Sequence, residues 1–268
     1  MRKFSEPQAL GLVFGACGSF LGDGAMDRKF AVWLLITLSC GVGAAQSKDF
    51  WQTKDYRQWN EKECKKLLED SPWAQDYTFT QTLIEPLQRA TGERAGESKP
   101  QMSYLAQFRS ALPIQQALIR LQQINNKYDQ MAPEQKQEFD QRAAKLLNAD
   151  FAEVIAIHVN YNSNVAVYDR EMANYWHAQT TEKLKNSAFL IGPKGEKIPP
   201  QRFNVTTGAG REFTLYFPRM YEGQPLVGQQ DKTIKLEFMH PRVSDQGESR
   251  VLLEFKADKM IINNAAVY

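Results

Sequence analysis

Short runs of alternating apolar and polar residues beyond position 186 constrain the fold more than any other feature of this sequence. In residues 232–238 the alternation places Ile234, Leu236 and Phe238 on one face of an extended strand. Similar runs, separated by Gly and Pro residues, occupy positions 188–191, 197–205, 212–217 and 250–256. These five runs predict an antiparallel β structure in the C-terminal part of the chain.

Two more strands are predicted upstream of this region. Residues 104–110 suit a short strand, and residues 154–159 are rich in β-branched side chains. Seven short strands are typical of an immunoglobulin-like sandwich. The predicted fold class is therefore α+β, with a β-sandwich-like (immunoglobulin-like) antiparallel domain, inserted helices and an N-terminal helical segment. A mixed α+β sheet covered by helices on one face is the alternative.

Apolar residues at spacings of three and four predict three helices between the strands. The first covers Pro113–Met131 and the second Pro133–Leu147, and we expect them to form an antiparallel pair joined through Ala132. The third covers Val167–Lys185. These helices precede the second and third predicted strands. Their apolar stripes are interpreted as core rather than as partner-binding surface.

Upstream of the first strand, the sequence predicts an aromatic-rich helical segment followed by a linker. Asn60 followed three residues later by Glu63 is a helix-start signal. Residues 91–100 have no apolar period, which is typical of a solvated linker. The expected organisation is an extension with a signal peptide (1–45), this segment with its linker (46–100) and the sandwich-like domain (101–268).

The apolar stretch Phe30–Ala45 predicts a secretory signal peptide. It is too short for a membrane span, which needs about 20 apolar residues. Arg28 and Lys29 precede the stretch, and the small residues 43–45 end it, as a signal peptidase requires. We therefore expect export to the periplasm or the exterior, with cleavage after Ala45.

Two points about this segment stay open. Met26 gives the signal peptide a positively charged start of normal length, so Met26 is favoured over Met1 as the true start. Cys40 is a possible lipid attachment site, because residues 38–41 partly resemble a bacterial lipobox. Thr37 stands where that box normally has Leu, which favours soluble export. Membrane attachment is expected only if Cys40 is lipidated.

Charge and cysteine content narrow the classes of partner and cofactor. The chain has 33 Lys plus Arg against 31 Asp plus Glu, a formal net charge of +2, and no long run of like charge. This balance argues against a nucleic-acid partner. Cleavage after Ala45 leaves Cys64 as the only cysteine, so the fold has to be held by a packed core instead of a disulfide. The 3 histidines show no short metal-ligand spacing, and no metal or cofactor is expected.

Four aromatic residues near the predicted mature N-terminus are candidate binding residues: Trp51, Tyr56, Trp59 and Trp73. Aromatic side chains are the anchors of many sugar- and peptide-binding surfaces. The same residues are also suited to fixing the N-terminal helix onto the β domain, because Trp is highly buried on average. The structural use is the favoured interpretation, and the binding face is the alternative.

His177 is the best candidate for acid–base chemistry. It lies on a predicted helix that also carries Asp169 and Glu171. Helix surfaces commonly mix such charges, so a solvated surface is the simpler interpretation. His158 lies in an apolar strand and is expected to be a core or edge residue. His240 precedes a proline in a turn, where a solvated side chain is expected. No catalytic residue is therefore predicted in the leading hypothesis.

Several motifs of the mature chain carry a family resemblance. They are Asp49-Phe50-Trp51 with Tyr56 and Trp59, Ser71-Pro72-Trp73-Ala74, Phe108–Pro113, Phe217-Pro218-Arg219, Leu236-Glu237-Phe238 and Phe255–Met260. On these motifs the chain resembles uncharacterised exported proteins of soil bacteria of the acidobacterial type. The resemblance implies export and a bacterial source, and it implies no catalytic residue.

The leading hypothesis is a non-enzymatic exported protein that binds an envelope or periplasmic protein or a glycan. The alternative is an exported hydrolase that uses His177 with Glu171 or Asp169. A hydrolase of this kind requires the three side chains to face one cleft together with a nucleophile.

Overall fold

A computed structural model describes residues 49–80, 101–206, 210–243, 249–263 and 265–268. These residues belong to one compact unit, Lys48–Tyr268. The predicted signal peptide, Cys40 and the predicted linker 91–100 lie outside the described residues. The expectations about cleavage and lipidation therefore stay predictions.

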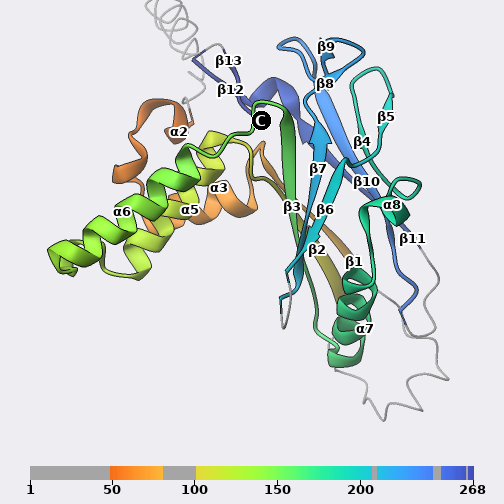
Figure 1. Cartoon of the computed structure of the whole chain (residues 1–268), viewed down its shortest axis with the longest axis horizontal. Helices are drawn as coiled ribbons and strands as arrows, with labels where there is room; N and C mark the ends of the chain where they lie inside the picture. Colours follow the sequence, from red (N-terminus) through yellow and green to blue (C-terminus); the bar gives the residue numbers. More distant parts are fainter. Residues whose placement is uncertain (1–48, 81–100, 207–209, 244–248, 264) are drawn as a thin grey trace, which may run out of the picture. The chain divides into compact units, whose positions relative to one another are not determined.

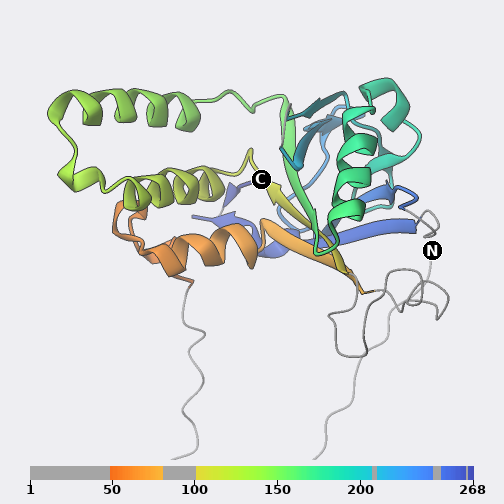
Figure 2. The same cartoon turned by 90° about the horizontal axis from the view of Figure 1, so that it is seen from below.

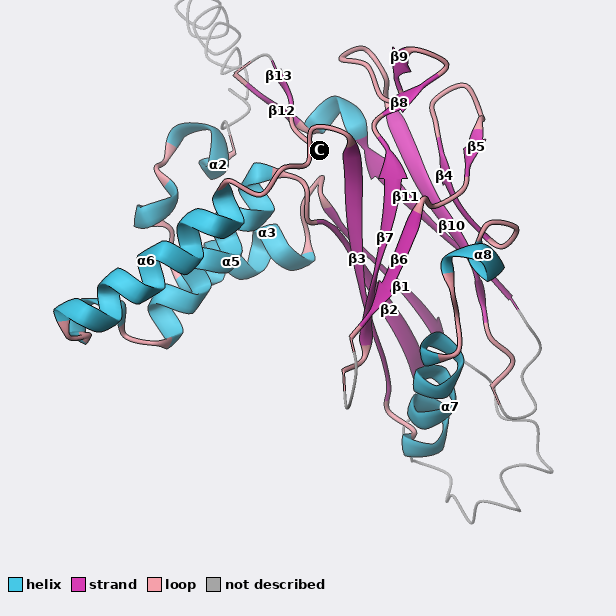
Figure 3. Cartoon of the chain, viewed as in Figure 1, coloured by secondary structure: helices cyan, strands magenta, loops and turns pink. Residues whose placement is uncertain are grey.

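One antiparallel sheet has five strands in the order β1-β2-β3-β7-β6. Its strands are β1 (Ala74–Thr80), β2 (Gln101–Phe108), β3 (Val154–Ser163), β7 (Glu212–Pro218) and β6 (Arg202–Val205). Figures 1 and 3 show β3, β7 and β6 side by side, with β1 and β2 beyond them. Neighbouring strands of this sheet are hydrogen-bonded to one another, although helices lie between some of them in the sequence.

The second antiparallel sheet has four strands in the order β11-β10-β4-β5. Its strands are β11 (Ser249–Lys256), β10 (Thr233–His240), β4 (Ala188–Ile191) and β5 (Lys197–Ile198). Among the described residues there are also two small hairpins: β8 (Met220–Tyr221) with β9 (Gln224–Pro225), and β12 (Ile261–Ile262) with β13 (Ala265–Ala266).

The core lies between the apolar faces of the two sheets. Tyr104 on β2 contacts Phe238 on β10 with ring centroids 5.0 Å apart, and Phe108 contacts Phe255 at 4.8 Å. On β10 and β11 every second residue is buried along most of each strand, as the alternation in the sequence predicts. The predicted α+β class with antiparallel sheets is confirmed.

Helix α7 (Ala166–His177) contributes its apolar side to the same core. Trp176 stacks on Phe213 of β7 with centroids 4.1 Å apart and contacts Phe238 of β10 at 5.6 Å. The predicted helix over 167–185 is divided, since α7 ends at His177 and α8 covers Thr181–Leu184. Thr180 starts α8 by accepting a hydrogen bond from the amide of Lys183.

The remaining helices lie beside the five-stranded sheet. They are α2 (Phe50–Thr53), the 3-10 turn η1 (Tyr56–Gln58), α3 (Glu61–Glu69), α5 (Leu112–Asn125), the 3-10 turn η2 (Tyr128–Gln130) and α6 (Pro133–Leu147). Another 3-10 turn, η3 (Ala257–Lys259), follows β11. Figure 2 shows α5 between α3 and α6, with α5 and α6 antiparallel. The predicted helix pair is confirmed, with the first helix ending at Asn125 rather than Met131.

Two strand predictions were wrong in detail. Residues 74–80 were assigned to the helical segment, but they form β1 at the edge of the five-stranded sheet. The predicted hairpin over 188–205 is divided between the sheets: β4 pairs with β5, and β6 pairs with β7. Pro199 and Pro200 separate β5 from β6 and have no amide hydrogen to continue the β5 ladder.

Candidate functional site

Three of the four candidate aromatic residues are part of the core. Trp51, Trp59 and Trp73 are 8%, 1% and 0% exposed. Trp51 and Trp73 meet edge to face at 5.9 Å, and the indole of Trp59 donates a hydrogen bond to the carbonyl oxygen of Lys54 at 3.1 Å. These three rings hold the N-terminal helices against the β domain and present no open face to a ligand.

Tyr56 is the exception, because its side chain is half-buried and borders a groove. The groove lies between η1, α5 and α6 and has a volume of about 550 Å³. Its lining is Tyr56, Arg57, Ile119, Arg120, Gln123, Tyr128, Asp129, Asp140, Ala143, Ala144 and Leu147. We call this feature the η1–α5–α6 groove. A second cavity of about 410 Å³ shares Ile119 and Ala143 with it.

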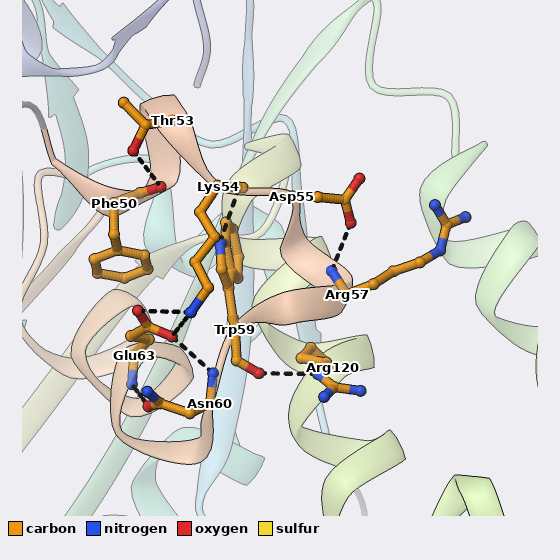
Figure 4. A network of polar contacts seen from close by, with 9 residues as sticks. All are labelled: Phe50, Thr53, Lys54, Asp55, Arg57, Trp59, Asn60, Glu63 and Arg120. Carbon is orange, nitrogen blue, oxygen red and sulfur yellow. Dashed lines mark hydrogen bonds and ion pairs between the residues drawn. The ribbon is translucent and has the colours of Figure 1, made fainter.

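A network of polar contacts fixes η1 beside α5 (Figure 4). The carboxylate of Asp55 accepts a hydrogen bond from the amide of Arg57 at 2.8 Å, which starts the turn that carries Tyr56. The Arg120 Nε of α5 donates to the carbonyl oxygen of Trp59 at 2.9 Å. Main-chain atoms on both sides of Tyr56 are therefore held by specific partners.

Glu63 connects the start of α3 to the residues before η1. Lys54 Nζ lies 2.8 Å from one carboxylate oxygen of Glu63 and 3.0 Å from the other. Glu63 also accepts from the amide of Asn60 at 2.7 Å, and Asn60 accepts from the amide of Glu63 at 2.9 Å, which completes a capping box. Burial alone would raise the pKa of Glu63, but the hydrogen bonds from Lys54 and the Asn60 amide outweigh it and lower the pKa.

Replacement of Asn60 by alanine is expected to lower the free energy of unfolding by about 1 kcal/mol, because the start of α3 loses its side-chain cap. Urea unfolding followed by circular dichroism measures this change. Lys65→Ala is the control: it removes an exposed pair with Glu61 on the same helix, and we expect a change below about 0.5 kcal/mol. Equal effects of the two variants would show that the cap contributes nothing.

The groove is lined by equal numbers of positive and negative side chains and by polar groups that can form hydrogen bonds. Arg57 lies over the ring of Tyr56 at 5.1 Å, and its guanidinium makes no hydrogen bond or ion pair with a described residue. The hydroxyl of Tyr128 donates to the carboxylate of Asp140 at 2.8 Å, and this hydrogen bond raises the pKa of Tyr128. Two arginines and two aspartates line the groove, so its formal charge is zero.

The candidate acid–base residues on α7 are not brought together. His177 Nε2 lies 3.0 Å from the carbonyl oxygen of Thr206, so this nitrogen carries a proton and donates. Asp169 is eight residues earlier, about 12 Å along the helix axis, and is paired with Arg211. Glu171 is six residues from His177, about 9 Å along the axis. Helix geometry thus separates both carboxylates from the imidazole.

The other histidines and the cysteine occupy enclosed positions, and the expectation of a solvated His240 was wrong, because its side chain is buried. Burial lowers the pKa of His240 to about 4, and burial together with the charge of Arg109 lowers the pKa of His158 to about 4. Cys64 is fully buried, which raises the pKa of its thiol to about 11 and makes it a poor nucleophile.

Among the described residues, no group of three or more potential metal ligands converges. No described helix is both long and apolar enough to cross a membrane.

Comparisons with known proteins identify no relative of this chain. No protein-family model matches the sequence, no curated protein matches it, and no solved structure is significantly similar to it. The assignment of the η1–α5–α6 groove therefore rests on the contacts and charges of its own residues.

Proposed function

We propose that this chain is an exported bacterial protein that acts as a non-enzymatic binding module of the cell envelope or periplasm. The η1–α5–α6 groove is its binding site, and a neutral glycan is the ligand class. The observation that carries this proposal is the guanidinium of Arg57, which lies above the half-buried ring of Tyr56 in a groove of zero net formal charge. This guanidinium has no hydrogen bond or ion pair with a described residue. An aromatic face with adjacent planar hydrogen-bonding groups suits the apolar face and the hydroxyls of a sugar.

The charge balance of the groove favours a glycan over an acidic or basic peptide. Arg57, Arg120, Asp129 and Asp140 all line the groove, so its net charge attracts neither sign of ligand charge over the other. Arg120 is already bonded to Trp59 and Gln123, whereas the guanidinium of Arg57 has no hydrogen-bond partner among the described residues. A neutral ligand with several hydroxyl groups matches this arrangement, and an envelope protein is the alternative partner.

Calorimetric titration of the purified protein with cello-, malto- and N-acetylchito-tetraose tests the proposal. We expect at least one of these neutral tetraoses to bind, and we expect Tyr56→Ala and Arg57→Ala each to weaken binding roughly tenfold. Tyr221→Ala removes an exposed tyrosine outside the groove and is the matched control. Binding that survives Tyr56→Ala unchanged, or the absence of binding by every tetraose, would contradict the proposal.

We infer further that the two sheets form an immunoglobulin-like sandwich. With β1 set aside, the orders β2-β3-β7-β6 and β11-β10-β4-β5 correspond to strands A-B-E-D and G-F-C with one added C′ strand. The aromatic contacts of β2 with β10 and β11 support a shared core. An experimental structure in which the inner faces of the sheets do not meet would overturn this assignment.

Export is supported by the apolar stretch Phe30–Ala45 and by the resemblance to exported acidobacterial-type proteins. Intact-mass spectrometry of the protein from soluble and membrane fractions of a bacterial host tests it. A soluble product that begins at Gln46 is expected. A lipidated product that begins at Cys40 would make the protein membrane-tethered, and an unprocessed chain in the cytoplasm would overturn the proposal of export.

The alternative function, an exported hydrolase built on His177, has less support. The hydrogen bond of His177 to Thr206 uses Nε2, and α7 separates the imidazole from Asp169 and Glu171. Ester or glycoside hydrolysis that disappears in the His177→Ala variant would favour this alternative over the binding module.

A further inference from the structure

Arg109 is a largely buried cation, and its side chain has no partner in the part of the chain that the structure describes. It directly follows β2, and the alternation of that strand places its side chain on the outer face of the sheet. Its amide donates a hydrogen bond to the carbonyl oxygen of Ala156 at 2.8 Å. The Nε atom is buried and makes no hydrogen bond. Its guanidinium forms no hydrogen bond or ion pair with any residue that the structure describes. Burial accordingly lowers the pKa of Arg109.

The neighbours of Arg109 on the outer face of the five-stranded sheet come from β3 and β7. His158 on β3 stands opposite Thr214 on β7, and His158 Nδ1 lies 3.0 Å from the Thr214 hydroxyl. Gln107 of β2 pairs with His158 from the other side, so Arg109 is the diagonal neighbour of the imidazole. The face around Arg109 is therefore polar and carries few charges.

The carboxylate of Glu212, which lies near Arg109, contacts other side chains. Glu212 of β7 accepts a hydrogen bond from the Thr206 hydroxyl at 2.9 Å and lies 3.3 Å from His158 Nε2. Glu212 forms no ion pair with Arg109 and acts on it only at longer range. No carboxylate of the described residues therefore forms an ion pair with Arg109.

An unpaired buried charge destabilises a fold, and proteins seldom retain one without a use. We propose that Arg109 is the anchor of a binding site for an anionic group, a carboxylate or a phosphate, on the outer face of the five-stranded sheet. The planar guanidinium offers two parallel N–H donors to either group. This site is separate from the η1–α5–α6 groove, so a failure of the glycan proposal does not affect it.

His158 provides a spectroscopic reporter for this site. Its pKa is lowered by burial and by the positive charge of Arg109, while Glu212 raises it. An anion bound to Arg109 cancels part of that positive charge, so the pKa of His158 must rise. The groups that face the imidazole are Gln107 and Arg109 from β2, Asn160 from its own strand, and Glu212 and Thr214 from β7.

Proton NMR of the imidazole resonances during a pH titration measures this change. Sodium phosphate and sodium acetate are the two probes, and a chloride solution of equal ionic strength is the reference. We expect an upward shift of the pKa of His158 by about half a pH unit or more with at least one probe. The probe with the larger shift identifies the preferred group. Identical titrations in all three solutions would overturn the proposal.

Arg109→Met separates a binding role from a structural role. Removal of an unpaired buried cation is expected to raise the Tm in chloride solution. It should also abolish two responses expected of the wild type: the rise in Tm when phosphate or acetate binds, and the upward shift in the pKa of His158. Arg250→Met, on an exposed position of β11, is the control and should keep the wild-type response. A lower Tm for Arg109→Met in every solution, with the anion response retained, would show that Arg109 only supports the fold.

Discussion

Replacement of Trp73 by alanine is expected to lower the free energy of unfolding by about 3–5 kcal/mol. The side chain is fully buried, so its removal leaves a large cavity beside Trp51. The indole nitrogen also donates a hydrogen bond to the carbonyl oxygen of Val267, which connects the C-terminal residues to the start of β1. Loss of this donor leaves a carbonyl group without its partner. Urea unfolding followed by far-UV circular dichroism measures the effect.

Two further variants make this prediction specific. Trp73→Phe keeps most of the apolar volume and removes the donor, and we expect a smaller loss of about 1–2 kcal/mol. Leu252→Ala removes a large apolar side chain that is 42% exposed, and we expect a change within about 0.5 kcal/mol. If Trp73→Ala lowers the free energy of unfolding by less than about 1 kcal/mol, Trp73 and its neighbour Trp51 are not part of the core.

Acidification is expected to destabilise the protein between pH 6.5 and 4, through His240. Its Nδ1 lies 2.8 Å from the hydroxyl of Tyr104. Burial raises the pKa of Tyr104, so this hydroxyl keeps its proton and can donate a hydrogen bond to Nδ1. In that arrangement the neutral ring carries its proton on Nε2, which is buried and has no hydrogen-bond partner among the described residues. A second proton would remove the acceptor for Tyr104 and place a charge in the core.

The sign of the effect follows from the lowered pKa of His240. The unfolded chain binds the proton near pH 6.5, whereas the folded protein binds it only near pH 4. The stabilisation is complete above pH 6.5 and is lost as the pH falls through this window, and it amounts to about 3 kcal/mol for one histidine. His158 has its pKa lowered in the same direction and adds to the loss.

Unfolding free energies measured by urea titration at several pH values test this prediction. His240→Asn keeps an acceptor for Tyr104 but cannot take up a proton, so its stability should fall less steeply between pH 6.5 and 4 than that of the wild type. Because the comparison is between slopes, a lower stability of the variant at neutral pH does not affect it. Equal slopes would show that His240 is not held neutral by the fold.

Local patterns in the sequence predict most of the secondary structure correctly. The period-two runs place β4, β7, β10 and β11, and the three-and-four spacing places α5, α6 and most of α7. Strand β1 is missed because it lies at a sheet edge, where Asp76 and Thr78 are exposed and only one face is half-buried. The assignment of β6 to the other sheet depends on long-range pairing, which alternation alone does not encode.

The candidate site is predicted less well than the fold. The sequence does not distinguish the four aromatic candidates from one another. In the structure three of the rings are in the core, and of the four only Tyr56 borders the groove. The groove also needs Arg120 and Asp140, which are more than 60 residues further along the chain. The outer face of the sheet is equally hard to predict. Arg109 follows an apolar run and His158 lies within one, and only the strand register places His158 opposite Gln107 on the outer face.

The central claim is that the η1–α5–α6 groove binds a neutral glycan, and amide NMR of the isotope-labelled protein tests it most directly. The protein is titrated with the tetraose that gives the largest heat of binding. We predict shifts of the amide signals of Tyr56, Arg57 and Arg120, with no shift at Tyr221. Shifts confined to residues outside the groove, or no shift with any tetraose, would contradict the claim.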